Sequence, residues 1–103
     1  MEQKKTITLD LTDCKYLGEI HERIRIAFDF PEWYGANLSA FDDLMDTECD
    51  ADEVIILGSN TLTKELKEYV INLTDILDKI VKEREYYSSL YAHIKSFSYR
   101  IES

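Results

Sequence analysis

The feature of this sequence that most constrains its fold is the alternation between strand-like and helix-like spacing of apolar residues. Apolar residues recur at every second position over residues 6–11, are continuous over 54–57, and alternate again over 95–101. Between these segments they are spaced by three and four, as on one face of a helix. Helices between successive strands are crossover connections, which join parallel strands. The chain is therefore predicted to be an α/β protein with a three-stranded parallel sheet packed with helices.

Two helices are expected between the first two strands. The spacing predicts one from Tyr16 to Phe28, and Pro31 would stop it because the residue before a proline avoids helical backbone angles. Asn37 is a suitable N-cap for a second helix over residues 38–47. Residues 31–36, between the two helices, form a loop rich in aromatic residues.

The second half of the chain predicts a strand, a long helical stretch and a final strand. The continuous apolar run over residues 54–57 is typical of a strand buried on both faces. Helical spacing over 61–91 fits one long helix or two with a break near 72–74, and its wide apolar stripe favours packing on the sheet. A homodimer through residues 62–81 is an open alternative. The residues expected on one face of the last strand are Phe97, Tyr99 and Ile101.

Size and charge limit the possible classes of function. The 103 residues contain no linker or repeat, which predicts a single domain over residues 1–103. Twelve lysine and arginine residues against 21 aspartate and glutamate residues give a net charge of −9. This charge disfavours direct binding of nucleic acid or of an anionic membrane and favours a basic protein partner. The alternative is that the acidity only keeps the chain soluble.

The beginning of the sequence and its two cysteines predict a cytoplasmic location. The first residues lack the apolar stretch of a signal peptide, and no apolar run is long enough to span a membrane. Cys14 and Cys49 belong to no CxxC or Cys/His cluster, so neither a zinc site nor a redox motif is expected. Two free thiols are the favoured interpretation, with a single disulfide as the alternative.

No catalytic signature is present, and no enzyme, metal site or cofactor is expected. His21 and His93 are isolated histidines, which are usually structural or exposed. A cation could in principle bind between Asp42, Asp46 and Asp50, but calcium and magnesium take about six or more oxygen ligands, often in a glycine-containing loop.

The second expected helix separates its apolar residues from its acidic ones. At about 100° per residue, one side carries Leu38, Phe41, Leu44 and Met45. The opposite side carries Ser39, Asp42, Asp43 and Asp46. Trp33 and Tyr34 in the preceding loop are residue types favoured at interfaces, and Gly35 would permit a close approach or a positive φ angle. This pattern predicts a partner-binding surface; the alternative is a solvated face with Trp33 or Tyr34 packed under the loop.

The same segment resembles a known family. The residues that carry the resemblance are Pro31, Glu32, Trp33, Tyr34, Gly35, Asn37, Leu38, Ala40 and Asp43. In this order and spacing they resemble the segment that marks the barstar family of ribonuclease inhibitors. The resemblance implies a three-stranded parallel sheet packed with helices, in agreement with the periodicity. It also implies that the loop and second helix enter the substrate cleft of a ribonuclease, where acidic side chains replace RNA phosphates.

Individual roles follow from the resemblance by position. Asp43 corresponds to the central acidic residue of the family's helix, and Trp33 to a loop aromatic residue that stacks in the cleft. Gly35 corresponds to the loop glycine, and Asn37 and Leu38 to neighbouring contact residues.

The chain also departs from the family pattern. Ser39 stands where the family's prototype has a second acidic residue, and Asp42 stands where the prototype has a tryptophan. Glu48 occupies a position after the second helix where a tryptophan is usual. Acidity at Asp42 instead of Ser39 would suit a target with a shifted arginine. The resemblance implies a further acidic contact from the last helix, for which Glu83 and Glu85 are candidates.

The sequence thus predicts a cytoplasmic inhibitor, or immunity protein, that blocks the active site of a basic ribonuclease or nuclease toxin as a monomer in a one-to-one complex. The residues predicted to bind the partner are Trp33, Tyr34, Gly35, Asn37, Leu38, Ser39, Asp42, Asp43 and Asp46. The alternative is an acidic interaction module that binds a basic regulatory protein without inhibiting a nuclease.

Overall fold

The computed structural model describes residues 5–47, 51–92 and 94–102 and contains three strands and three α-helices in the predicted order. The elements are β1 (Thr6–Asp10), α1 (Leu17–Phe28), α2 (Leu38–Thr47), β2 (Glu53–Leu57), the short 3₁₀ helix η1 (Ser59–Thr61), α3 (Lys64–Leu90) and β3 (Ser98–Glu102). Among the described residues, no helix is long and apolar enough to cross a membrane.

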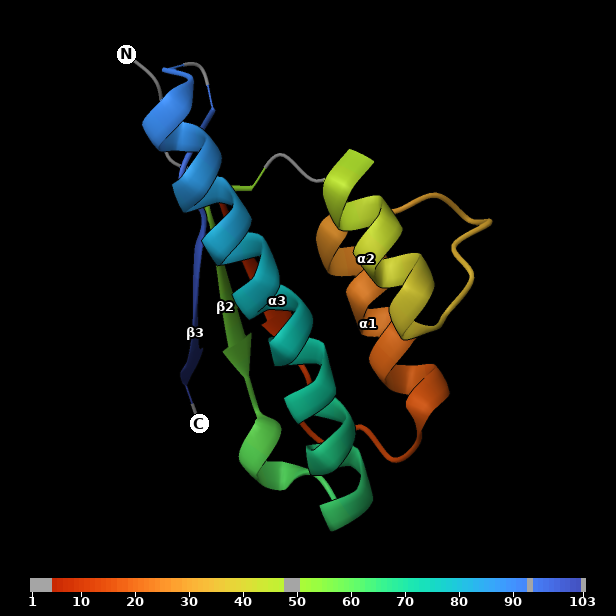
Figure 1. Ribbon diagram of the computed structural model, residues 1–103. Coiled ribbons are helices and arrows are strands. Elements are labelled where there is room, and N and C mark those ends of the chain that lie inside the picture. Colours follow the sequence, from red (N-terminus) through yellow and green to blue (C-terminus); the bar gives the residue numbers. More distant parts are fainter. Residues whose placement is uncertain (1–4, 48–50, 93, 103) are drawn as a thin grey trace.

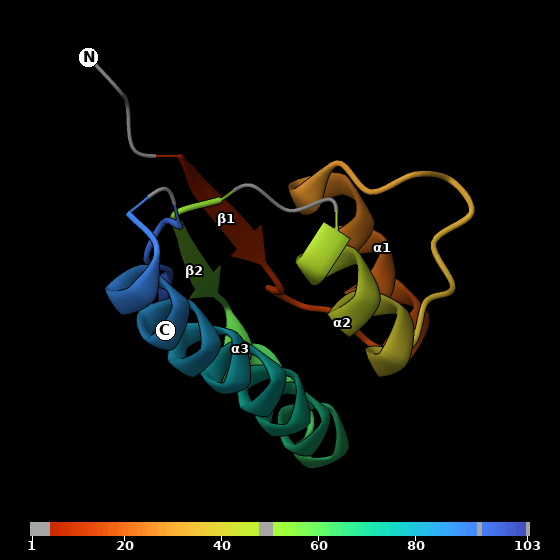
Figure 2. The same ribbon diagram turned by 45° about the horizontal axis from the view of Figure 1, so that its top comes forward.

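The three strands form one parallel sheet with β2 at its centre, which confirms the predicted fold class. The strand order β1-β2-β3 advances in one direction, so two right-handed crossovers place all their helices on the same face. Figures 1 and 2 show α1, α2 and α3 together on one side of the sheet. Figure 1 also shows α2 and α3 running in the same direction, opposite to the strands.

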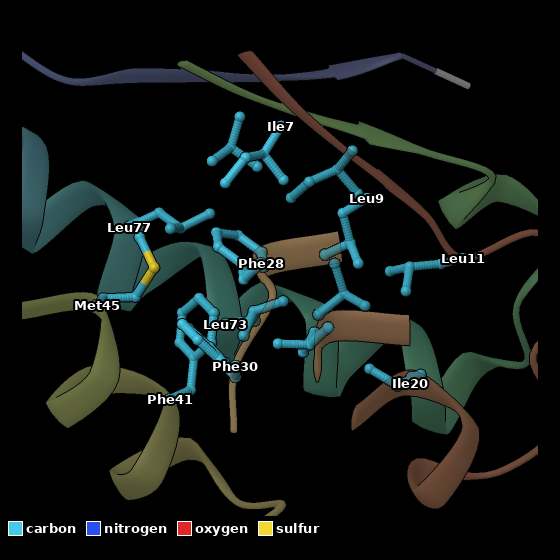
Figure 3. Close-up of a cluster of buried hydrophobic side chains, with 14 of the residues drawn as sticks. Ile7, Leu9, Leu11, Ile20, Phe28, Phe30, Phe41, Met45, Leu73 and Leu77 are labelled. Carbon is cyan, nitrogen blue, oxygen red and sulfur yellow. The ribbon is translucent and has the colours of Figure 1, made fainter. Parts of the chain in front are cut away.

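The core fills the space between the helices and the covered face of the sheet. Ile7 and Leu9 point into it from β1, and Val54 and Ile56 from β2. Figure 3 shows phenylalanines of the α1–α2 region and leucines of α3 meeting beneath Ile7 and Leu9 of β1. The largest fully buried side chains are Phe41, Leu9, Leu11, Ile20, Ile24, Met45, Ile56, Leu73, Leu77, Ile80 and Val54.

The prediction that β2 is buried on both faces was wrong. Val54 and Ile56 are buried, but Ile55 and Leu57 on the other face are only half-buried. The physical reason is that all three helices cover one face, so the opposite face of the sheet stays open. We call this uncovered side the open face.

The long helical stretch is one helix, which settles the choice between one helix and two. Thr63 caps α3, its side chain accepting a hydrogen bond from the backbone N–H of Leu66 at 3.4 Å. Near the expected break, the hydroxyl of Thr74 donates to the carbonyl of Ile71 at 2.8 Å, so this side chain is satisfied inside the helix. The buried side chains of α3 end at Ile80, and the helix continues ten residues farther, to Leu90.

The last strand begins later than predicted. Phe97 is buried but precedes β3, Tyr99 is half-buried, and the side chain of Ile101 is 48% exposed. β3 lies at the edge of the sheet, so its side chains have strand neighbours on one side only. Alternation of apolar residues correctly located this strand but did not reveal its edge position.

Candidate partner-binding surface

The segment between α1 and α2 begins at a sharp helix end. Asp29 follows α1 in the left-handed conformation (φ 55°, ψ 41°), and its N–H donates to carbonyls of the last turn. The N–H of Phe30 donates to the carbonyl of Arg25 at 2.9 Å, which closes the helix by the 6→1 bond typical of such ends. Thus α1 already ends at Phe28, and Pro31 only restricts the backbone angles of the segment that follows the helix. We call residues 29–37 the aromatic loop; Figures 1 and 2 show it projecting from the helical side of the molecule.

Buried aromatic rings anchor the aromatic loop from beneath. Phe30 stacks on Phe28 with ring centroids 5.3 Å apart, and Tyr34 lies 5.4 Å from Phe30. Phe41 of α2 meets Phe28 edge-on at 5.7 Å. The loop is therefore packed onto both helices that it connects.

A buried histidine adds a polar anchor at the same place. The Nδ1 atom of His21 lies 2.7 Å from the hydroxyl of Tyr34, and its Nε2 atom lies 2.5 Å from the hydroxyl of Tyr69 in α3. In a neutral imidazole one nitrogen donates and the other accepts, so one tyrosine receives a hydrogen bond from the ring and the other donates one. His21 thereby links α1, the aromatic loop and α3.

Burial sets the charge state of this group. It lowers the pKa of His21 and raises the pKa values of Tyr34 and Tyr69. All three side chains are therefore held in their neutral forms near neutral pH. The network is a structural support, which fits the expectation that a lone histidine here is structural.

Trp33 has the opposite environment to its neighbour Tyr34. Its side chain is 71% exposed, more than any other large hydrophobic side chain of the described residues, whereas Tyr34 is buried. Of the two aromatic residues predicted to contact a partner, the structure thus presents Trp33 to solvent and packs Tyr34 under the loop. Tyr34 can support an interface from below, and Trp33 can enter one.

The sequence suggested either a close approach or a positive φ angle for Gly35, and the structure shows these two features at two different residues. Gly35 does not carry a positive φ angle; that conformation falls on Ala36, with φ of 52°. A Cβ atom on Gly35 would lie 3.1 Å from the Cβ of Ala40. Gly35 therefore makes room for the close approach of the loop to α2.

Asn37 caps α2 as predicted. Its Oδ1 accepts from the N–H of Ala40 at 2.8 Å, and its Nδ2 donates to the carbonyl of Gly35 at 3.1 Å. Both ends of the side chain therefore fix the junction between the loop and the helix. Leu38 is half-buried against the core and Ser39 is exposed.

The acidic side chains of α2 lie next to the aromatic loop. Asp43 and Asp46 are exposed, whereas the side chain of Asp42 keeps only 29% exposure because it lies where α2 meets α3. We call these three carboxylates the acidic face. Phe41, Leu44 and Met45 point the other way, into the core, as the helical spacing predicted.

The sequence did not reveal that Asp42 is paired within the chain. Its Oδ2 accepts from Nζ of Lys79 in α3 at 2.5 Å, and its buried Oδ1 has no hydrogen-bond partner among the described residues. The hydrogen bond to Asp42 raises the pKa of Lys79, and the nearby charges of Glu83 and Asp46 raise it further. Of the two candidates on the last helix, Glu83 is thus near the acidic face, and Glu85 lies about 200° farther around α3.

Several sequence expectations fall outside the described residues, namely those on Glu48, Cys49, Asp50 and His93. Cys14 is a buried free thiol. In the described ranges, no group of three or more histidine, cysteine, aspartate or glutamate side chains could hold a metal ion.

The sequence analysis missed two residues that matter for this surface, Tyr69 and Lys79. Both lie in α3 and contact α1 or α2 from a distant part of the chain.

The comparisons with known proteins point to a family of inhibitors. The family described as Barstar (barnase inhibitor) matches residues 4–93. The searches of the curated proteins and of the solved structures each returned no match. Members of the matched family are inhibitors and not enzymes, in agreement with the missing catalytic signature. Because the match covers most of the sequence and the chain folds into the expected three-stranded parallel sheet, this chain belongs to the Barstar family.

Proposed function

We propose that this protein is an intracellular inhibitor that binds a basic ribonuclease and blocks its active site with the acidic face and the aromatic loop. The observation that carries the proposal is that the segment shared with the family exposes both the carboxylates of Asp43 and Asp46 and, within the loop that leads directly into the same helix, the ring of Trp33. The family's description as a barnase inhibitor supports the same role.

The chemistry of such a surface suits a ribonuclease cleft. A cleft that binds RNA offers arginine, lysine and histidine side chains to phosphates, and carboxylates on a rigid helix can take the place of those phosphates. Trp33 supplies a flat ring that can stack where a base would stack. The net charge of −9 speeds encounter with a basic protein.

The direct test is an inhibition titration. Purified protein is added in steps to barnase and to a panel of other small basic ribonucleases, with cleavage of a fluorogenic RNA as the readout. We expect the rate of at least one enzyme to fall linearly and to reach zero near one equivalent, with slower association at higher ionic strength. A mononucleotide that occupies the active site should slow association.

Two results of this titration would contradict the proposal. If the protein forms a complex with a basic ribonuclease but leaves RNA cleavage unchanged, it does not block the active site. The interaction module without inhibition, which the sequence left open, would then describe it better. If no ribonuclease of the panel binds or is inhibited, the proposal fails.

A further inference from the structure

The surface proposed to bind the ribonuclease includes a lysine, Lys79, next to the acidic face. Lys79 projects from α3 beside Asp42, and its side chain is 46% exposed. Its ammonium group donates to Asp42, and the charges of Glu83 and Asp46 lie near enough to act on it as well. The lysine ammonium therefore stands among the carboxylates of Asp42, Asp46 and Glu83, on a surface otherwise suited to a basic partner.

The pairing with Lys79 changes what Asp42 can do. One carboxylate oxygen of Asp42 is bonded to the ammonium group and the other is buried, so the carboxylate cannot receive a bidentate arginine from a partner. The ammonium group has three donors, and Asp42 takes one of them. Because the side chain of Lys79 is partly exposed, the remaining donors are open to a partner that approaches it. At this point the surface offers positive hydrogen-bond donors instead of acceptors.

Folding stability gives little reason for this arrangement. Ion pairs between side chains that remain partly exposed contribute little to stability, because water competes for both charges. In a closed interface the same ammonium matters more, because water no longer solvates it and it must find an acceptor. The same charge can therefore influence binding more than it influences folding.

We propose that Lys79 is a specificity-determining residue, which selects a basic ribonuclease that presents an acceptor oxygen, a carboxylate or a backbone carbonyl, opposite its ammonium group. A ribonuclease that presents arginine or lysine at this point is repelled. Selection by a repulsive element is an effective way to discriminate between partners of similar overall charge. The inference rests on the proposed function and adds which members of that class of partner are accepted.

The test asks whether reversing the charge at position 79 strengthens or weakens binding. Dissociation constants are measured for the wild-type protein and for Lys79→Glu, Lys79→Met and Lys67→Glu, with the ribonuclease of the panel that the wild-type protein inhibits best. Lys67→Glu makes the same charge change on another side of α3, where Lys67 and Ile101 line a hollow next to β3. General attraction between an acidic and a basic protein predicts that both reversals tighten binding.

We expect the two reversals to act in opposite directions. Lys67→Glu should tighten binding by less than about threefold, through long-range attraction alone. Lys79→Glu should weaken it by at least about tenfold, and Lys79→Met, which keeps most of the side-chain length, by an intermediate factor. Thermal unfolding of each variant checks that the fold is retained. If Lys79→Glu does not fold, the affinity of Lys79→Met decides: weaker binding supports the inference, and unchanged or tighter binding overturns it.

The outcomes separate this inference from the proposed function. If the wild-type protein inhibits a ribonuclease and Lys79→Glu binds it as well or better, the inference is overturned and the proposed function stands. If the wild-type protein inhibits no ribonuclease of the panel, the proposed function fails, and this inference fails with it.

Discussion

The aromatic loop and the acidic face lie next to each other but are held in different ways. The loop rests on buried rings and on the His21 network, so its shape depends on contacts inside the protein. The acidic face rests on the outer side of a helix whose inner side is in the core, and its exposed carboxylates can be exchanged without changing that core. The shape of this surface therefore depends on the buried contacts under the aromatic loop, whereas its charge depends on the outer side of α2.

This separation predicts which changes affect folding and which affect binding. Substitutions beneath the loop should lower the free energy of unfolding, and should weaken binding only as a consequence. Substitutions of the exposed carboxylates of the acidic face, Asp43 and Asp46, should weaken binding while the free energy of unfolding stays nearly the same. The four predictions below test this division, from the largest expected effect to the smallest.

Removal of the Tyr34 side chain should have the largest effect. Tyr34→Ala deletes a buried ring and leaves His21 without one hydrogen-bond partner, so we expect the free energy of unfolding to fall by about 3–5 kcal/mol. Tyr34→Phe keeps the ring and should cost only about 1–2 kcal/mol. Urea unfolding measures both. A Tyr34→Ala variant as stable as the wild-type protein would show that the loop is not held from beneath.

Asp43→Ala should affect binding far more than folding. A carboxylate at the centre of a closed interface leaves a partner cation unpaired when it is lost, so we expect the dissociation constant to rise by a factor on the order of 100. Because Asp43 is exposed, the free energy of unfolding should change by less than about 1 kcal/mol.

The control for Asp43→Ala is the same loss of charge on the other side of the molecule. Glu102 lies on the open face, in register with Asp10 and Leu57, and is exposed. Asp52 would be a poor control, because its side chain accepts from the backbone N–H of Lys5 at 2.8 Å and is needed near β1. Equal losses of affinity for Asp43→Ala and Glu102→Ala would mean that only net charge matters, and would contradict a specific acidic face.

The His21 network should make stability depend on pH in a known direction. Burial lowers the pKa of His21 in the folded protein, so the unfolded chain, with an ordinary histidine pKa of about 6.5, binds a proton more readily. The contribution of His21 is therefore complete above this pH and is lost as the pH falls from there through the lower folded pKa. A protonated ring would also have to donate to both tyrosines, although one of them donates to the neutral ring.

The measurement is urea unfolding between about pH 7.5 and about pH 5.5, a range above most carboxyl titration. Stability should fall towards the lower pH in the wild-type protein and should fall less in His21→Gln, which keeps a polar side chain without the titration. The same slope in both proteins would remove His21 as the cause. If binding weakens along with stability in this range in the wild-type protein but not in His21→Gln, protonation of His21 affects binding through the aromatic loop that it supports.

The sequence predicted the fold well because the fold depends on local periodicity and on crossover geometry. It correctly assigned the apolar side of α2 and the cap at Asn37, since both follow from spacing within one helix. It could not predict the open face beside β2, because a continuous apolar run does not say which side helices will cover.

The sequence also could not predict the contacts made by α3. Tyr69 meets His21 across 48 positions, and Lys79 meets Asp42 across 37, so no local pattern links the members of either pair. Both contacts depend on how α3 lies against α1 and α2. They decide which predicted contact residues face a partner and which ones support the surface.

Ala36→Gly should give the smallest effect and is the most specific test of the loop backbone. Ala36 has a φ of 52°, a left-handed conformation that costs a residue with a Cβ atom about 1–2 kcal/mol and that glycine adopts readily. Because glycine also loses more entropy on folding, we expect a net gain of only about 0.5–1 kcal/mol in the free energy of unfolding. The matched control is Ala27→Gly in the last turn of α1, where Ala27 has helical backbone angles and the same chemical change should cost up to about 1 kcal/mol. Opposite signs would show that the loop backbone holds Ala36 against its own preference, as expected of a surface shaped from beneath. Destabilisation at both positions would mean that Ala36 is not strained, and that the anchors under the loop do not dictate its backbone.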